Sequence, residues 1–394
     1  MATIGIDIGA YQHAVAVCRD GQTEADRPVL RISALRDGFD ELDRLLERSG
    51  PIDRAVMESS GHYWFALASH LQARGVPVAL VNPVASKYFA KRRLQRAKSD
   101  PADARTLAAL GMVDRPRTRD TLATAELREA ARFAMTLVQE QARVCQRILR
   151  LIDIGFPELH QAFEDPSCAT AIALLKAAPT ARATLSKRAT TLAAARTAGG
   201  RVIGPKKAEQ VRALARTTVA APELERQVAF EMELLIEQHE TLERQIERAE
   251  AHLATLVDSD VVRRLRTIPG VGAATAAALV AEIGDIFRFD DFDQLVAFAG
   301  VHAAERSSGK KGADPETSWH MAKTGDAYLR AALYRMALVG TVHNPVIRAH
   351  YLRKRAQGKS KMNALGHCMK KALAIVWGVW RSDHDFVVPE GIPS

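Results

Sequence analysis

Cysteine is scarce in this chain of 394 residues, which has only four, and no two of them form a Cys-x-x-Cys pair. This spacing argues against a zinc ribbon or a disulfide framework and fits a reducing compartment. Long apolar runs are also missing, since no stretch approaches the ~18 residues that a membrane span needs. The first residues show no pattern of a cleavable signal. We therefore expect a cytoplasmic protein with no membrane partner.

Acidic residues are absent or rare in three segments, although the chain as a whole has 46 of them against 55 Lys and Arg. Residues 86–99 contain six basic residues and no acid, residues 176–216 contain ten and one Glu, and residues 327–382 contain eleven and no acid. Ordinary surfaces mix both signs to limit self-repulsion, so these segments favour a phosphate backbone as partner over a merely solvated basic surface. The candidates in the first segment are Lys87, Lys91, Arg92, Arg93, Arg96 and Lys98.

The first ~120 residues alternate short β-rich runs with helical patterns. The runs IGIDIG and HAVAVC and a third at 28–33 precede a helical pattern through Phe39 and Leu42. A strand at 53–58, a helix at 63–73, a strand at 78–81 and a helix near Pro101 follow. Three strands followed by strands alternating with helices predict an α/β, ribonuclease-H-like domain over residues 1–120.

Residues 121–258 change to a heptad pattern that runs from Leu127 to Leu151 and again from Leu224 to Leu256, through Glu231 and Leu235. This predicts two long coiled-coil helices that pair with each other or with another protomer. A basic, Ala-rich helical insertion separates them at about 157–222. Residues 259–394 predict an all-α domain that opens with a helix-hairpin-helix, whose Gly270 and Gly272 are candidate phosphate-binding residues.

Four carboxylates stand where the predicted strands end and where a helix starts. Asp7 lies in the first strand, Glu58 ends a later one, and Asp100 and Asp103 flank Pro101, so that Asp100 is placed to cap the helix. Taken singly, each acid has a structural explanation as a cap or a solvated end. Taken together, they predict an oxygen-ligand site for Mg²⁺ or Mn²⁺, and two such ions can activate an attack on a phosphodiester.

Several motifs in this order carry a family resemblance. The N-terminal ones are IGIDIGAYQHAVAV, VMESSGHYW and LVNPVASKYFAKRRLQRAKSDPADARTLA, and the C-terminal ones are RLRTIPGVGAATAAALVAEIG, FDQLVAFAGVHAAERSSGKKG and MAKTGDAYLRAALYRMA. The chain thereby resembles the DEDD transposases, insertion-sequence recombinases with a RuvC-like domain that are related to pilin-gene-inverting recombinases. The segment 313–320 is longer than the usual spacer, and Ala322 stands where a serine is common, so the register from Ser308 to Lys323 is open.

The resemblance implies that Asp7, Glu58, Asp100 and Asp103 are a metal-binding tetrad and that Ser308, before Gly309, is a nucleophile. Ser307 is the alternative nucleophile, and without the family the segment 307–312 is typical of a flexible basic loop. The further candidates for nucleic-acid contact are Lys310, Lys311, Lys323 and Arg330. The family also implies DNA as substrate, a noncoding bridge RNA, and dimers or tetramers in which the serine and the tetrad come from different protomers.

The leading hypothesis is therefore a site-specific DNA recombinase that moves an insertion sequence with Mg²⁺ and a covalent phosphoserine. A metal-dependent junction nuclease or DNA invertase with the same tetrad is the second. A sugar-kinase-like ATPase would share Ile6-Asp7-Ile8-Gly9, but it would need an Asp-x-Gly-Gly motif, which does not occur. A non-catalytic nucleic-acid-binding scaffold is the alternative outside the enzymes.

Overall fold

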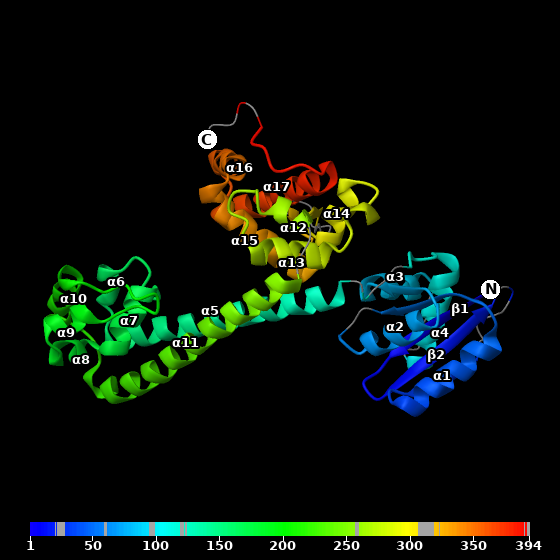
Figure 1. Ribbon diagram of the computed structural model, residues 1–394, viewed down its shortest axis with the longest axis horizontal. Helices are drawn as coiled ribbons and strands as arrows, with labels where there is room; N and C mark the ends of the chain where they lie inside the picture. The colour runs from blue at the N-terminus through cyan, green and yellow to red at the C-terminus, as the bar shows by residue number, and fades with distance from the viewer. Residues whose placement is uncertain are drawn as a thin grey trace, which may run out of the picture. The chain divides into compact units, whose positions relative to one another are not determined.

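The computed structural model divides the chain into two compact units, Met1–Glu126 and Leu127–Ser394, which are described separately (Figure 1). It describes residues 1–19, 21, 28–58, 61–93, 99–118, 122, 124–256, 260–305, 319–322, 324–389 and 391. Within these ranges, none of the helices has both the length and the apolar character to span a bilayer.

A five-stranded mixed sheet forms the centre of the first unit. Its spatial order is β3-β2-β1-β4-β5; β1, β2 and β3 pair antiparallel, whereas β4 runs parallel to β1 and β5 runs parallel to β4. The strands are β1 (Ala2–Ile8), β2 (Gln12–Arg19), β3 (Val29–Ser33), β4 (Ile52–Glu58) and β5 (Val78–Val81). This order fits a ribonuclease-H-like sheet and confirms the α/β prediction for this part of the chain.

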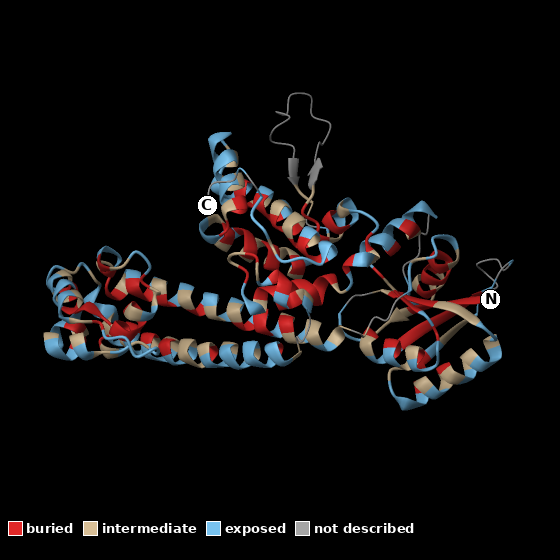
Figure 2. Ribbon diagram, turned by 45° about the horizontal axis from the view of Figure 1, so that its top comes forward, coloured by how far each residue is buried: buried red, intermediate tan, exposed pale blue. Residues whose placement is uncertain are grey.

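Helices cover both faces of the sheet, as the alternation of its side chains requires. Ile4 and Ile6 of β1 belong to one core with Leu42 of α1 (Arg36–Ser49) and Leu67 of α2 (Trp64–Ala73). On the other face, alternate strand residues such as Ala16 and Val56 pack against α3 (Pro83–Arg92) and α4 (Asp100–Val113). Figure 2 shows the buried strands between the two layers of helices. Each strand therefore sends alternate residues to the α1–α2 face and to the α3–α4 face.

Helix α4 lies directly on β1 because Gly5 has no side chain. A Cβ atom at Gly5 would lie 2.2 Å from the Ala104 carbonyl oxygen and 2.2 Å from the Ala108 nitrogen. The two elements also meet at Gly111, near the end of α4, where an added Cβ would lie 2.6 Å from Cγ2 of Thr3 in β1. Since Gly111 meets Thr3 and Ala104 meets Gly5, α4 runs antiparallel to β1 and its first turn lies toward the Asp7 end.

Two helix starts differ from the sequence expectation. α3 was not expected, yet Asn82 caps it by accepting a hydrogen bond from the Val84 nitrogen (2.8 Å), and Pro83 is well placed in its first turn. α4 begins at Asp100 itself rather than after it, because the extended Ser99 supplies the carbonyl that accepts from the Asp103 nitrogen (2.9 Å). Asp100 is thus the first helical residue and not the cap.

Two long antiparallel helices, α5 (Ala125–Gly155) and α11 (Glu225–Leu256), run side by side (Figure 1). A Cβ atom at Gly155 would lie 2.6 Å from Cγ1 of Val228, and Ala131 and Leu253 share a core at the opposite ends. The predicted seam is correct for much of its length but wrong near its start. Leu224 precedes α11 and is exposed. Met232 and Ile236 are buried where Glu231 and Leu235 were expected, because they continue the apolar face from Val228.

The expected helical insertion is present between these two helices. Its core joins Phe156, Leu174 and Val211 to residues of both long helices. Its segments are α6 (Leu159–Ala162), α7 (Ala169–Ala177), α8 (Ala181–Ser186), α9 (Ala189–Ala194), α10 (Pro205–Arg216) and the 3₁₀ turn η1 (Pro222–Leu224).

The C-terminal part is mostly helical, around a core that includes Leu279, Leu333 and Leu373. Its helices are α12 (Asp260–Leu265), α13 (Ala273–Ile283), η2 (Ile286–Arg288), α14 (Phe292–Ala299), α15 (Ala327–His343), α16 (Pro345–Ala356) and α17 (Lys361–Ser382). The all-α prediction is nevertheless wrong, since β6 (Ala303–Glu305) and β7 (Trp319–Met321) pair antiparallel. Three-residue strands are too short to produce a recognisable alternation.

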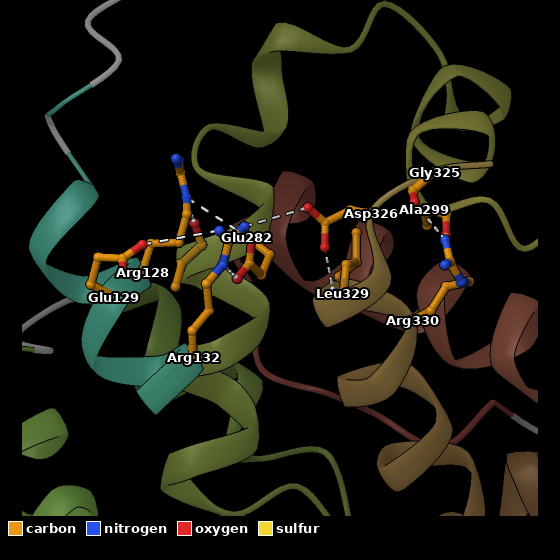
Figure 3. A network of polar contacts seen from close by, with 10 residues as sticks. Arg128, Glu129, Arg132, Glu282, Ala299, Gly325, Asp326, Leu329 and Arg330 are labelled. Carbon is orange, nitrogen blue, oxygen red and sulfur yellow. Dashed lines mark hydrogen bonds and ion pairs between the residues drawn. The ribbon is translucent and has the colours of Figure 1, made fainter. Parts of the chain in front are cut away.

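A buried ion pair joins α5 to the C-terminal helices (Figure 3). Arg132 donates from Nε to Oε1 of Glu282 (2.7 Å) and from Nη2 to Oε2 (2.8 Å), while its Nη2 lies 3.7 Å from Oδ2 of Asp326. The Glu282 side chain is only 2% exposed, and its burial raises its pKa above the ordinary value. Arg128 lies 3.9 Å from the same carboxylate. Glu282 therefore depends on its arginine partners to remain charged.

Replacing Gly5 with Ala should lower the free energy of unfolding by about 1–3 kcal/mol, since the new methyl group meets backbone atoms of α4. Urea unfolding followed by circular dichroism measures this. Gly378→Ala is the matched control, because no atom lies within 4 Å of its added Cβ and a helical Ala is favoured. An equal effect of both substitutions would contradict the close approach.

Arg132→Met should destabilise the fold by about 3 kcal/mol at pH 8, because it leaves the Glu282 carboxylate buried with weaker compensation. The loss should be smaller at pH 5, since burial already raises the pKa of Glu282 and the variant raises it further, so Glu282 takes up a proton as the pH falls. Urea unfolding at both pH values provides the measurement. The double variant Arg132→Met/Glu282→Leu should recover stability, and a double variant as unstable as the single one at both pH values would refute this account.

Candidate active site

Asp7 and Glu58 lie at the same end of two neighbouring parallel strands. The register pairs Ile6 with Met57, so that Asp7 and Glu58 come next on β1 and β4. Both are half-buried. Side chains two residues apart on a strand point to the same face. Asp7 lies two residues after Gly5, which contacts α4, and Glu58 lies two residues after Val56, which packs against α3 and α4. Both carboxylates are therefore on the face that α4 covers.

Asp100 and Asp103 occupy the first turn of α4, which the Gly5 contact directs toward this end of β1. Asp103 is half-buried and Asp100 is exposed. The positive end of the helix dipole favours carboxylates in this turn. The fold thus brings all four predicted acids to one end and one face of the sheet, from two strands and one helix.

Ser86 of α3 is a residue of this site that the sequence analysis missed. It is buried, and its Oγ donates a hydrogen bond to Oε1 of Glu58. Ser86 lies one turn into a helix that begins with Asn82-Pro83, and this start signal was available in the sequence. Ser86 fixes one carboxylate oxygen of Glu58 and leaves the other for a ligand.

The donor set of this end of the sheet consists of carboxylate oxygens, which suits Mg²⁺ or Mn²⁺. In the described part of the chain, no three acidic, His or Cys side chains stand close enough together to hold a metal ion. The four acids thus share one end of the sheet, but their side chains do not form a coordination shell for a metal ion. The Glu58 carboxylate is instead held by the hydrogen bond from Ser86.

The predicted basic segment continues from α3. Lys87, Lys91, Arg92 and Arg93 are exposed, which leaves them accessible to a phosphate backbone. Arg92 also forms an ion pair with Asp114 (3.2 Å). The remaining candidates of this segment, Arg96 and Lys98, lie outside the described residues.

The two glycines of the predicted hairpin differ in their surroundings. Gly270 has a φ of 86°, and a Cβ there would lie 3.1 Å from Cγ1 of Val339, so this glycine serves the turn and its packing on α15. Gly272 caps α13, and no atom lies within 4 Å of its added Cβ. A helix, a glycine turn and a second helix are therefore present, and contact with phosphate at Gly272 stays a prediction.

The ends of the segment that carries the predicted nucleophile are held next to each other. β6 and β7 pair from Ala303–Met321 to Glu305–Trp319, and the Ala322 nitrogen donates to the His302 carbonyl oxygen (3.0 Å). The candidates between and beside these strands lie outside the described residues, namely Ser307, Ser308, Lys310, Lys311 and Lys323.

Arg330 joins the backbone before β6 to the backbone after β7 (Figure 3). Its Nη1 donates to the carbonyl oxygens of Ala299 (3.3 Å) and Gly325 (2.7 Å). Gly300 has a φ of 66°, and a Cβ there would lie 2.6 Å from the Gly325 nitrogen, so the two glycines allow the backbones to meet. This structural role of Arg330 was not predicted. The predicted phosphate contact of Arg330 stays a prediction beside it.

Two family models match this chain. A model of the DEDD transposases of IS110 elements, described as "Transposase", matches residues 4–157, which include the four acids. A second model, described as "Transposase IS116/IS110/IS902 family", matches residues 262–352, which include the glycine turn and the serine segment.

Two of the similar proteins match over nearly the whole chain. An uncharacterized 44.8 kDa protein of insertion element IS116 from Streptomyces clavuligerus is 25% identical over 97% of this chain and 95% of its own length. The putative transposase for the IS117 mini-circle of Streptomyces coelicolor is 28% identical over 94% of this chain and 91% of its own. A pilin gene-inverting protein of Moraxella bovis is 28% identical over 31% of this chain and 37% of its own. The chain belongs to the IS116/IS110/IS902 family of transposases, enzymes that cleave and recombine DNA.

Proposed function

We propose that this transposase exchanges DNA strands for its insertion sequence through a metal-dependent reaction with a covalent phosphoserine intermediate. The convergence of Asp7, Glu58 and the first turn of α4 on one face of the sheet is the observation that carries the proposal. Carboxylates from two strands and one helix start on the same face suit a divalent cation, which a scaffold without catalysis would not need.

In this proposal Asp7, Glu58, Asp100 and Asp103 hold Mg²⁺ or Mn²⁺. When bound, the metal neutralises charge on the phosphodiester and favours the attack on phosphorus. Ser86 orients Glu58 through its hydrogen bond, and α4 supplies two acids from a rigid helix start. The exposed cations of α3 bind the DNA backbone next to the acids.

Ser308, with Ser307 as its alternative, is the proposed nucleophile. Its oxygen bonds to phosphorus while the bond from phosphorus to the 3′ oxygen breaks, and the serine proton ends on the departing 3′ oxygen. A 3′ hydroxyl of the other strand then attacks phosphorus, and the serine regains a proton as its bond to the DNA breaks. The phosphodiester energy is retained, so no ATP is needed.

The proposed partners are the DNA of the element ends and the target, a noncoding guide RNA, and further copies of this chain as a dimer or tetramer, in the bacterial cytoplasm. The acid-free segments support backbone contacts with paired nucleic acid. A DNA invertase or junction nuclease is the second candidate, favoured by the similarity to a pilin gene-inverting protein.

The Asp7→Asn and Ser308→Ala variants should both abolish strand exchange, but for different reasons. Asp7→Asn removes a metal ligand, and Ser308→Ala removes the oxygen that bonds to the DNA. The assay incubates protein with junction DNA, Mg²⁺ and the transcript of the element, and it detects the protein–DNA adduct on denaturing gels.

Ser307→Ala is the matched control and should retain the adduct. If Ser307→Ala abolishes the adduct and Ser308→Ala does not, the nucleophile is Ser307. Strand cleavage at full rate in both serine variants would overturn the covalent route and support hydrolysis.

Ser86→Ala should raise the Mg²⁺ concentration for half-maximal activity by about 10-fold, since residues that orient metal ligands typically contribute 10–100-fold. A Mg²⁺ titration of strand exchange measures this, with saturating Mg²⁺ restoring most of the rate. Ser86→Thr keeps the hydroxyl and serves as control. Identical Mg²⁺ curves for Ser86→Ala and the wild type would exclude the orienting role.

A further inference from the structure

A dense group of cations lies where α16 ends and α17 begins. We call it the corner cluster: His350, Arg353, Lys354, Lys359, His367 and Lys371. The two helices pack closely here, as Cys368, next to His367, has its Sγ 3.9 Å from the Ile347 carbonyl oxygen of α16. Arg353 Nη2 lies 2.8 Å from Nδ1 of His350. The cluster thus combines residues of two helices and the turn between them.

The cluster has no carboxylate to balance it. Within the described ranges, no Asp or Glu oxygen lies within 4 Å of Arg353, Lys354, Lys359 or Lys371, whereas the neighbouring Lys370 has Asp293 at 3.9 Å. The helix dipole accounts for the cations in the last turn of α16. It does not account for Lys371 in the interior of α17.

The pKa values of two histidines in the cluster are lowered, in part by this excess of positive charge. Burial, together with Arg353, Lys354 and Lys371, lowers the pKa of His350 to about 4. Burial and the cations Lys354 and Lys359 also lower the pKa of His367. Both imidazoles are therefore neutral at pH 7, and a bound anion would favour their protonation by offsetting these charges.

We propose that the corner cluster is a binding site for the phosphate backbone of duplex DNA, held by Arg353, Lys354, Lys359 and Lys371. The cluster belongs to the acid-free segment 327–382, and four cations without a carboxylate partner in the described ranges suit phosphates, which carry no sequence information. DNA is favoured over RNA because the proposed function gives the chain a DNA substrate. The inference rests on the DNA substrate of the proposed function, but it concerns binding alone.

The test measures binding of the full chain to a duplex DNA of about 20 base pairs in EDTA, over a range of NaCl concentrations. The triple variant Lys354→Gln/Lys359→Gln/Lys371→Gln should bind at least 10-fold more weakly and should reduce the slope of log K against log salt by about 2–3, as each phosphate contact contributes ~0.9. The loss should be the same for two unrelated sequences.

The matched control is Arg226→Gln/Arg244→Gln/Arg248→Gln, which removes three exposed cations from the Glu-rich α11. It should leave the slope unchanged. Equal slopes for the wild type and the corner variant would overturn the proposal, and so would a loss that appears only with duplex RNA. The strand-exchange assay is separate, so an unchanged slope beside an intact serine adduct refutes the corner site and leaves the recombinase in place.

A pH series separates this role from a purely structural one. Bound phosphate raises the pKa of His350 and His367, so DNA affinity should rise as the pH falls from 7 to 5, with proton uptake on binding. The His350→Gln/His367→Gln variant should lose this gain in affinity between pH 7 and pH 5. A wild type and a variant with the same pH profile would contradict the proposal.

Discussion

The backbone contact between Gly5 and α4 is the constraint on which the proposed active site depends. With any side chain at this position, α4 would have to move away from β1, because an added Cβ lies 2.2 Å from backbone atoms of Ala104 and Ala108. Together with the contact between Gly111 and Thr3, it gives the direction of the helix and therefore the place of its first turn. Asp100 and Asp103 reach the end of the sheet where Asp7 and Glu58 lie through this packing, not through their position in the sequence.

In the second unit, β6 and β7 hold together the two ends of the segment that contains the candidate nucleophiles Ser307 and Ser308. Gly300 and Gly325 let two backbones meet, and Arg330 binds the carbonyl groups at this junction. Asp326 caps α15 and lies 3.7 Å from Arg132, so the same junction is linked to the buried Glu282 pair. The glycine motifs of the C-terminal segment thus have a packing explanation that is independent of any contact with nucleic acid.

Sequence patterns predicted the elements that are long enough to show a regular spacing of apolar residues. The apolar runs of β1 and β4, and the apolar seams of α5 and α11, are long enough to show their periodicity, although Met232 and Ile236 replaced Glu231 on the seam. β6 and β7 are three residues each and left no such pattern. The four acids were identified from the sequence, but Ser86 as a partner of Glu58 and Arg330 as a backbone anchor were not. Both depend on contacts between segments that only the folded chain brings together.

We propose that carboxylates from β1, β4 and the start of α4 bind one or two divalent ions. A crystal grown with Mn²⁺ and examined by anomalous diffraction tests this claim most directly. We expect an anomalous peak within about 2.2 Å of carboxylate oxygens of both Asp7 and Asp103. Manganese bound elsewhere, with none between β1 and the first turn of α4, would contradict the account.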